Sequence, residues 1–358
     1  MKLAASELIE NSRAKLLAFA RQQPEGVTAT GRLARIGVSV LGLVLAVSAL
    51  ASAADEGGRK ARTAAPVQGL GPRLPGERPQ AVAQGGSGIR RIYAATSNGL
   101  FVSADGGRRW DPLALPPAAG VEVLAMAVDP RDERRLYVGG RGGLWKSPDA
   151  GSTWTSIDLP THSVPRAIAV AATTPAVLYI GTDREGVFRS ADGGVSWVPA
   201  SRGLPESPAG GRPALITSLA VHPTNPDLAY AATELHGLYR TTDAGVKWVP
   251  INKGLGPFPL RRRTGGPRLL LDPLDPQRLL AFVIRPVHSH RLQTRLFQSA
   301  DGGEHWLPLE LELPREEQGA ALAVDPADPK GVLLFTTRGA LPLQWPPRAE
   351  GVRPESVR

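Results

Sequence analysis

The sequence contains no cysteine and only two methionines, and aromatic residues make up 5% of its 358 residues. The absence of cysteine excludes disulfide bonds, zinc sites built from thiolates and lipid attachment through a cysteine. A folded domain in this chain must therefore be stabilised by its core alone. Long apolar runs are also scarce, and the main exception is an uncharged stretch of 19 residues at 36–54.

Most of the chain lacks a strong excess of either charge. Residues 1–90 carry 12 basic and 6 acidic side chains, whereas residues 91–358 carry 30 basic and 27 acidic ones. The net charge of +9 is therefore concentrated near the amino terminus. Nucleic-acid-binding domains show a basic patch or stripe, so we expect no nucleic-acid partner for the larger part.

A short motif, Ser/Thr-x-Asp-x-Gly-x-x-Trp, occurs five times. Successive motif aspartates are 44, 43, 51 and 58 residues apart, which is the length of one four-stranded propeller blade. An aspartate can accept hydrogen bonds from nearby amides, glycine tolerates positive φ, and tryptophan buries a large ring. A motif repeated in every unit is expected to serve the fold. The five copies contain Asp105 and Trp110, Asp149 and Trp154, Asp192 and Trp197, Asp243 and Trp248, and Asp301 and Trp306.

Short apolar segments precede each motif and predict the other strands of a blade. In the second unit, 125–128 leads into an Asp-Pro turn, and 136–139 and 143–145 follow before the motif. Such segments, bounded by glycine, proline and aspartate, are typical of strands. The sequence therefore predicts an all-β propeller with the motif as the turn between strands three and four.

Six blades are predicted, although five or seven remain alternatives. A sixth unit follows from residue 321, but it lacks the motif, and the first unit has no clear strand before Ile92. Residues 80–83 are a candidate for that missing strand, because a closed ring removes exposed sheet edges.

These motifs resemble the Asp-box, or BNR, repeats of sialidases, sortilin-like receptors, some xyloglucan-cleaving enzymes and photosystem II stability/assembly factor-like proteins. The resemblance covers residues 88–345. It implies a β-propeller, but these families differ in function, so it does not by itself imply an activity.

The amino-terminal residues predict a membrane anchor. Residues 1–35 would form a cytoplasmic leader, 36–54 a transmembrane helix, and 55–87 a flexible linker rich in glycine and proline. Arginines before the helix and acids after it place the propeller outside the bacterial inner membrane. The alternative is a signal peptide cleaved at Ala53, giving a secreted protein. Residues 346–358 are expected to be a tail.

The loops between strands two and three, together with the links between blades, share one face of the predicted propeller. The long insertions, at 201–213, 252–267 and 285–295, are expected to be loops on this face. That face is rich in arginine, which is suited to an anionic partner, although ordinary solvated charges are the alternative. His288 and His290 lack a third ligand, so no metal and no cofactor are expected. The candidate binding residues are Arg141, Arg184, Arg212, Arg261, Arg262, Arg263, Arg285 and Arg291.

Evidence for catalysis in the sequence is weak. A glycosidase needs two carboxylates at a shared cleft, and Asp183, Glu185 and Glu234 are the only plausible group on the loop face. All five tyrosines lie in predicted strands, so none is placed to act as a sialidase-type nucleophile.

The sequence therefore favours a non-catalytic, membrane-tethered propeller that binds a membrane protein complex and supports its assembly or stability. The alternatives are a secreted or anchored glycoside hydrolase and a module that binds glycans or peptides.

Overall fold

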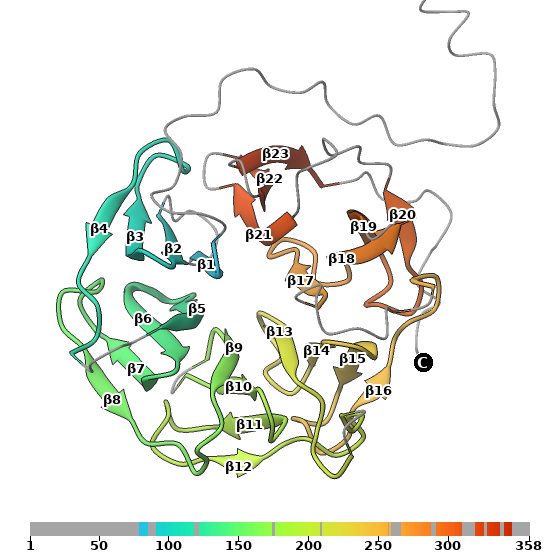
Figure 1. Ribbon diagram of the computed structural model, residues 1–358, viewed down its shortest axis with the longest axis horizontal. Coiled ribbons are helices and arrows are strands. Elements are labelled where there is room, and N and C mark those ends of the chain that lie inside the picture. Colours follow the sequence, from blue (N-terminus) through green and yellow to red (C-terminus); the bar gives the residue numbers. More distant parts are fainter. Residues whose placement is uncertain are drawn as a thin grey trace, which may run out of the picture. The chain divides into compact units, whose positions relative to one another are not determined.

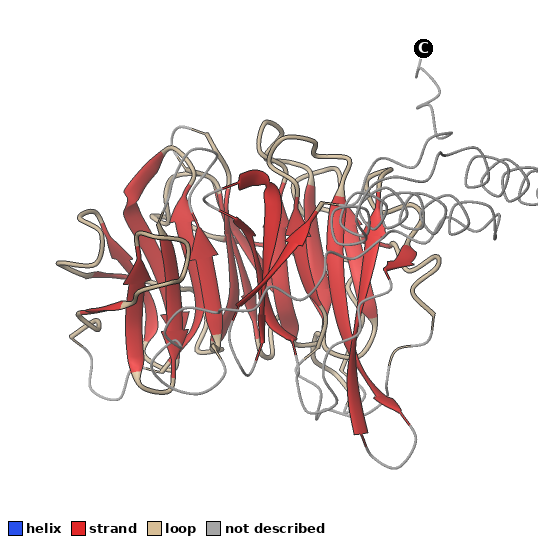
Figure 2. Ribbon diagram, turned by 90° about the horizontal axis from the view of Figure 1, so that it is seen from above, coloured by secondary structure: helices blue, strands red, loops and turns tan. Residues whose placement is uncertain are grey.

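The structure is a computed structural model, and it describes residues 79–84, 91–117, 122–173, 176–207, 210–256, 258, 266–287, 291–309, 319–325, 328–336 and 340–345. All regular structure in these residues is β-strand, arranged as six antiparallel sheets in a ring around a central channel (Figures 1 and 2). The prediction of a six-bladed, all-β propeller is confirmed.

Each sheet is formed by consecutive strands, and we number the six blades in chain order. Five blades have four strands, and three strands are described for the sixth. Blades 1 to 3 contain β1 (Ala81–Gln84), β2 (Ile92–Thr96), β3 (Gly99–Ser103), β4 (Asp111–Leu113), β5 (Val123–Asp129), β6 (Asp132–Gly140), β7 (Gly143–Ser147), β8 (Thr155–Ile157), β9 (Pro165–Val170), β10 (Leu178–Thr182), β11 (Val187–Ser190) and β12 (Val198–Pro199). Blades 4 to 6 contain β13 (Ile216–Val221), β14 (Ala229–Thr233), β15 (Gly237–Thr241), β16 (Val249–Pro250), β17 (Arg268–Leu271), β18 (Leu279–Val287), β19 (Arg291–Ser299), β20 (Leu307–Leu309), β21 (Gly319–Asp325), β22 (Asp328–Thr336) and β23 (Ala340–Gln344).

The second strand of each blade lies in the packed interior. Strands β2, β10 and β14 are buried along their whole length, which is why they consist of apolar and small residues rather than an alternating pattern. The second strand of four blades contains a tyrosine that is no more than 1% exposed. Tyr239, in a third strand, is 8% exposed. None of the five tyrosines is therefore accessible to a substrate.

The five motifs form the same turn. The Ser or Thr hydroxyl accepts a hydrogen bond from the glycine amide at 2.7 to 2.9 Å and donates one to the aspartate at 2.7 to 2.8 Å. The same aspartate oxygen accepts the amide four residues later. The motif glycines have positive φ, for example +85° at Gly245, so the turn requires a residue without a side chain there.

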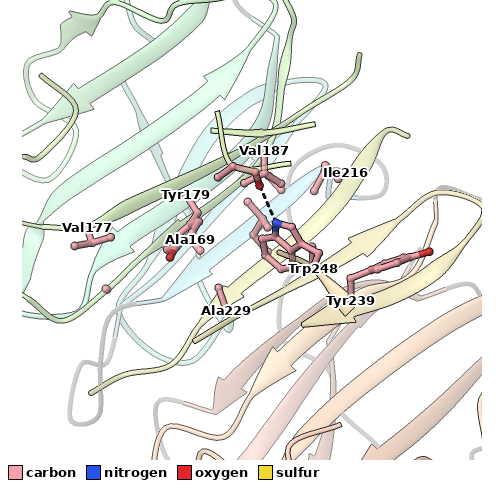
Figure 3. Packing of buried hydrophobic residues seen from close by; sticks show 13 residues of the cluster. Ala169, Val177, Tyr179, Val187, Ile216, Ala229, Tyr239 and Trp248 are labelled. Carbon is pink, nitrogen blue, oxygen red and sulfur yellow. Dashed lines mark hydrogen bonds between the residues drawn. The ribbon is translucent and has the colours of Figure 1, made fainter. Parts of the chain in front are cut away.

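Three of the five motif tryptophans donate a hydrogen bond to the preceding blade, whereas Trp110 donates within its own turn and Trp197 has no acceptor among the described residues. The indole of Trp248 in blade 4 is 1% exposed and donates to the carbonyl of Ala200 in blade 3 at 2.7 Å (Figure 3). Trp306 and Trp154 make the equivalent bonds to Ile251 and Ala114 of their preceding blades. Because a buried indole N–H needs an acceptor, each bond fixes one blade against the previous one.

The ring is closed by packing between blades 1 and 6. Trp110 of blade 1 lies edge-on against Phe335 of blade 6, with ring centroids 6.4 Å apart. Ile92 and Val82 of blade 1 belong to the same apolar cluster as Ala321 and Leu333 of blade 6. The last interface therefore also uses a motif tryptophan, through a ring contact rather than a hydrogen bond to the neighbouring blade.

One detail confirms a sequence-based expectation and one differs. Strand β1 occupies Ala81–Gln84 and pairs with β2, so it supplies the first strand of blade 1 for which 80–83 was the candidate, and the range 55–87 is not all linker. Residues 285–295 were expected to be a loop. Most of them continue strands β18 and β19, whose pairing runs from Leu279 with Ser299 to Val287 with Arg291. The hairpin extends because the backbones of the two segments continue the antiparallel pairing, from Val283 with Arg295 to Val287 with Arg291.

The predicted leader, anchor and most of the linker lie outside the described residues, as does the tail. No helix in the described part of the chain is long and apolar enough to cross a membrane.

Candidate functional site

A polar cavity of about 580 Å³ lies on the face formed by the loops between strands two and three. Five segments surround it: the beginnings of the inner strands of blades 2 and 3, the turns between β6 and β7 and between β10 and β11, and the link between blades 3 and 4. We call it the loop-face cavity. Its lining residues are Leu124, Arg141, His162, Ser163, Val164, Arg166, Asp183, Arg184, Glu185, Gly211, Arg212 and Pro213.

The turn between β10 and β11 brings two carboxylates to the cavity. The amide of Thr182 donates to the carbonyl of Gly186 at 2.8 Å, and the Thr182 hydroxyl accepts the amide of Glu185 at 3.0 Å. Gly186 has φ of +74°, which closes this tight turn. Asp183 and Glu185 are thereby held two residues apart on a rigid strand pair.

Both carboxylates also hold the segment that enters β9. Asp183 Oδ1 accepts the amide of Val164 at 3.0 Å, and Glu185 Oε1 accepts the hydroxyl of Ser163 at 2.9 Å. Asp183 Oδ2 lies 3.6 Å from Nε of Arg184. Glu185 lines the cavity, and its other carboxylate oxygen has no protein donor in the described part of the chain.

A β-bulge places a further arginine at the cavity. Ala167 pairs with Gly181 and Pro165 pairs with Thr182, so Arg166 is the extra residue of β9. Bulges bend a strand and redirect a side chain, and they are common near active sites. Arg166 lines both the loop-face cavity and the central channel, so it lies where the two meet.

The arginines of the cavity differ in how they are neutralised. Arg141 pairs with Glu122 at 2.8 Å, and Arg184 pairs with Asp183. The guanidinium groups of Arg166 and Arg212 have no hydrogen bond or ion pair to another described residue. The cavity therefore combines two carboxylates with two unpaired guanidinium groups.

The central channel is a second cavity, of about 400 Å³, between the inner strands of the six blades. Alanine, valine and leucine side chains dominate its lining, including Ala83, Ala127 and Ala323. A channel of this kind offers few groups for recognition or catalysis, so we place the candidate site at the loop-face cavity.

The structure brings together part of the predicted site. Five predicted residues, Asp183, Glu185, Arg141, Arg184 and Arg212, line one cavity. Arg166 was missed, because it lies within an apolar strand rather than a loop. The sequence carries one signal for it, since it is the only charged residue within the segment 164–171.

The other predicted residues lie elsewhere or outside the described residues. Glu234 occupies the equivalent turn of blade 4, where its amide donates to Leu215, and it does not line the cavity. Arg285 and Arg291 belong to β18 and β19, and their side chains are not described. Arg261, Arg262, Arg263, His288 and His290 also lie outside the described residues. Within the described ranges, no cluster of three or more His, Asp or Glu residues could hold a metal ion.

Part of the sequence is similar to curated proteins that are xyloglucanases. No protein-family model matches the chain. A xyloglucanase from Paenibacillus sp is 31% identical over 119 residues, which cover 31% of this chain and 11% of that enzyme. A xyloglucanase from Hypocrea jecorina is 29% identical over 136 residues, which cover 36% of this chain and 16% of that enzyme. The matched segments therefore span less than a fifth of these relatives.

Solved structures support the fold. A GH74 enzyme from Niastella koreensis has a TM-score of 0.50 and 17% identity over 73% of this chain and 44% of its own. An ancestral GH74 enzyme has a TM-score of 0.51 and 19% identity over 76% of this chain and 36% of its own. At these identities, the similarity establishes a β-propeller and nothing about activity.

The expectation of a non-catalytic assembly protein is contradicted by these relatives. The curated proteins that match the sequence are xyloglucanases. The error arose because the Asp-box motif is a folding element shared by enzymes and binding proteins, so it could not decide between them. The alternative expectation, a glycoside hydrolase or a glycan-binding module, agrees better.

Proposed function

We propose that this chain is a glycoside hydrolase that acts on xyloglucan or a related polysaccharide. The observation that carries the proposal is the partial sequence match to xyloglucanases, at 26% to 31% identity over 119 to 141 residues. The loop-face cavity supports it, because loops on a rigid scaffold commonly hold binding and catalytic residues.

Hydrolysis of a glycosidic bond uses a proton donor on one side and a second carboxylate on the other. In our proposal Glu185 is the proton donor, because one of its oxygens is held by Ser163 and the other is available to carry a proton. Asp183 is the second carboxylate, held by the Val164 amide and beside Arg184. The hydrogen bonds keep both groups in position for the reaction.

Release of reducing ends from xyloglucan by the purified chain tests the proposal. Asp183→Asn and Glu185→Gln should each lower the rate about 100- to 10,000-fold, the usual contribution of an acid or base group. Asp158→Asn is the matched control, because Asp158 is exposed and does not line the cavity. Absence of hydrolysis by the unmodified protein, or full activity of both variants, would contradict the proposal.

A second candidate function is polysaccharide binding without cleavage. It is favoured by the hydrogen bonds to Ser163 and Val164, since these give both carboxylates a structural role. Binding of xyloglucan with no release of reducing ends would select this function. In that case Asp183→Asn should lower the melting temperature rather than a rate.

The resemblance to Asp-box propellers remains part of the proposal and is supported by the five equivalent hydrogen-bonded turns. We also propose that residues 36–54 anchor the propeller outside the inner membrane, on the basis of their 19 uncharged residues. Extraction of membranes with alkaline carbonate tests this, because an anchored chain stays in the pellet and a secreted one does not.

A further inference from the structure

We propose that the loop-face cavity recognises a carboxylate group on the glycan, so that the preferred substrate is an acidic polysaccharide that carries uronic acid residues. This inference rests on the proposed function, because it names the substrate class of the same site. Arg166 and Arg212 are the residues that would bind the carboxylate.

The lining of the cavity is suited to a charged ligand. Ligand sites are usually lined by apolar and aromatic side chains with a few polar groups. Among the described residues, the lining includes four arginines and no Trp, Tyr or Phe. Without an aromatic platform, a neutral sugar ring has little flat apolar surface to stack on. Charge-assisted hydrogen bonds are the main interaction that these residues can offer.

Arg166 is partly buried, and its charge is not compensated. It projects from a bulge in β9, and no described carboxylate pairs with it. Burying part of a guanidinium without a partner is unfavourable, so an anionic ligand would restore the lost interactions. Arg212 approaches the same cavity from the link between blades 3 and 4 and is also unpaired. A guanidinium matches a carboxylate with two parallel hydrogen bonds.

A comparison of the bulges shows that a charged residue occupies this position in one blade only. The inner strands of blades 2, 4 and 6 have bulges at the same position, as the register of their pairing shows. The extra residue there is Leu124, Thr217 or Ala320, and only blade 3 has a charged one. A structural requirement of the repeat therefore does not explain Arg166, whereas a ligand at the cavity of blade 3 does.

The test is titration calorimetry of the full-length chain with a trimer of galacturonic acid and, separately, with a neutral xyloglucan oligosaccharide. We expect the acidic trimer to bind, and to bind less tightly at high salt. Arg166→Gln and Arg212→Gln should each weaken this binding about tenfold, the effect of one charge-assisted hydrogen bond. Arg108→Gln removes the same charge from the exposed motif turn of blade 1 and should leave binding unchanged.

Arg166→Lys is a second variant, and it remains informative if the fold does not tolerate glutamine at position 166. Lysine keeps the charge but lacks the planar fork, so we expect intermediate affinity. Wild-type affinity in Arg166→Lys and in Arg212→Gln, with unchanged melting temperatures, would overturn the inference. Inorganic phosphate is the third probe, and binding as tight as that of the trimer would also overturn it, since the site would then recognise any anion.

The outcomes separate the inference from the proposed function. Hydrolysis of xyloglucan with no binding of the acidic trimer would refute the carboxylate site and leave the hydrolase in place. Binding of the trimer through Arg166 and Arg212, without hydrolysis of any polysaccharide, would support the site and refute the hydrolase.

Discussion

Replacement of a motif tryptophan by phenylalanine should lower the free energy of unfolding most where the indole N–H donates to a neighbouring blade. In Trp248→Phe the carbonyl of Ala200 loses a buried donor at 2.7 Å, which costs about 1 to 3 kcal/mol. The smaller ring also leaves space at a site that is 1% exposed, and this adds about 1 kcal/mol. The expected loss in the free energy of unfolding is therefore about 2 to 4 kcal/mol.

Trp110 provides the matched control within the same chain. Its indole N–H donates to Gly107 of its own turn at 3.0 Å, and the side chain is only partly buried. Trp110→Phe should therefore cost about 1 kcal/mol, since water can replace the lost donor. Trp306→Phe should resemble Trp248→Phe, because its indole donates to Ile251 of the preceding blade at 2.8 Å.

Urea denaturation followed by circular dichroism measures all three variants under the same conditions. The midpoint should fall strongly for Trp248→Phe and Trp306→Phe and slightly for Trp110→Phe, with similar slopes. Equal losses in the three variants would refute the argument, because burial and the bond between blades would then not determine the contribution of the motif.

Two further predictions concern the motif turns. Ala150 has φ of 63°, so Ala150→Gly should stabilise the protein by about 0.5 kcal/mol, the relief of left-handed strain less the entropy of glycine. A lower melting temperature for this variant would contradict the assignment of strain. The hydroxyl and amide of Thr153 hold the pKa of Asp149 at about 2, below its usual 3.8, so its contribution to stability is present above pH 4 and is lost as the pH falls towards 2. Thr153→Ala should raise the pKa of Asp149 in an NMR titration, and an unchanged value would show that the hydroxyl has no role.

The blades were predictable because one local motif recurs at the length of a blade. Each motif contains its own turn, so the sequence alone places strands three and four beside it. Strand β1 was harder to assign, since Ala81–Gln84 is short and is defined by pairing with β2 rather than by its own pattern. The hairpin at 285–295 was expected to be a loop because an insertion in sequence does not reveal whether its two halves pair.

The site was predictable only in part, for a related reason. Asp183, Arg184 and Glu185 adjoin in sequence, and blade geometry placed them near Arg141 and Arg212. The position of Arg166 depends on a shift in register between β9 and β10, which is a property of the pairing and not of either strand alone. The motif could not decide between a glycoside hydrolase and a binding protein, because it is a folding element that both kinds of protein share.

Hydrogen exchange of the full-length chain, measured by mass spectrometry with and without the galacturonic acid trimer, tests most directly whether the loop-face cavity is the glycan site. The amides of 162–166, 183–186 and 211–213 are predicted to exchange more slowly when the trimer is present, while the motif turns on the opposite face stay unchanged. Protection confined to the motif turns, or no protection at saturating trimer, would contradict the account.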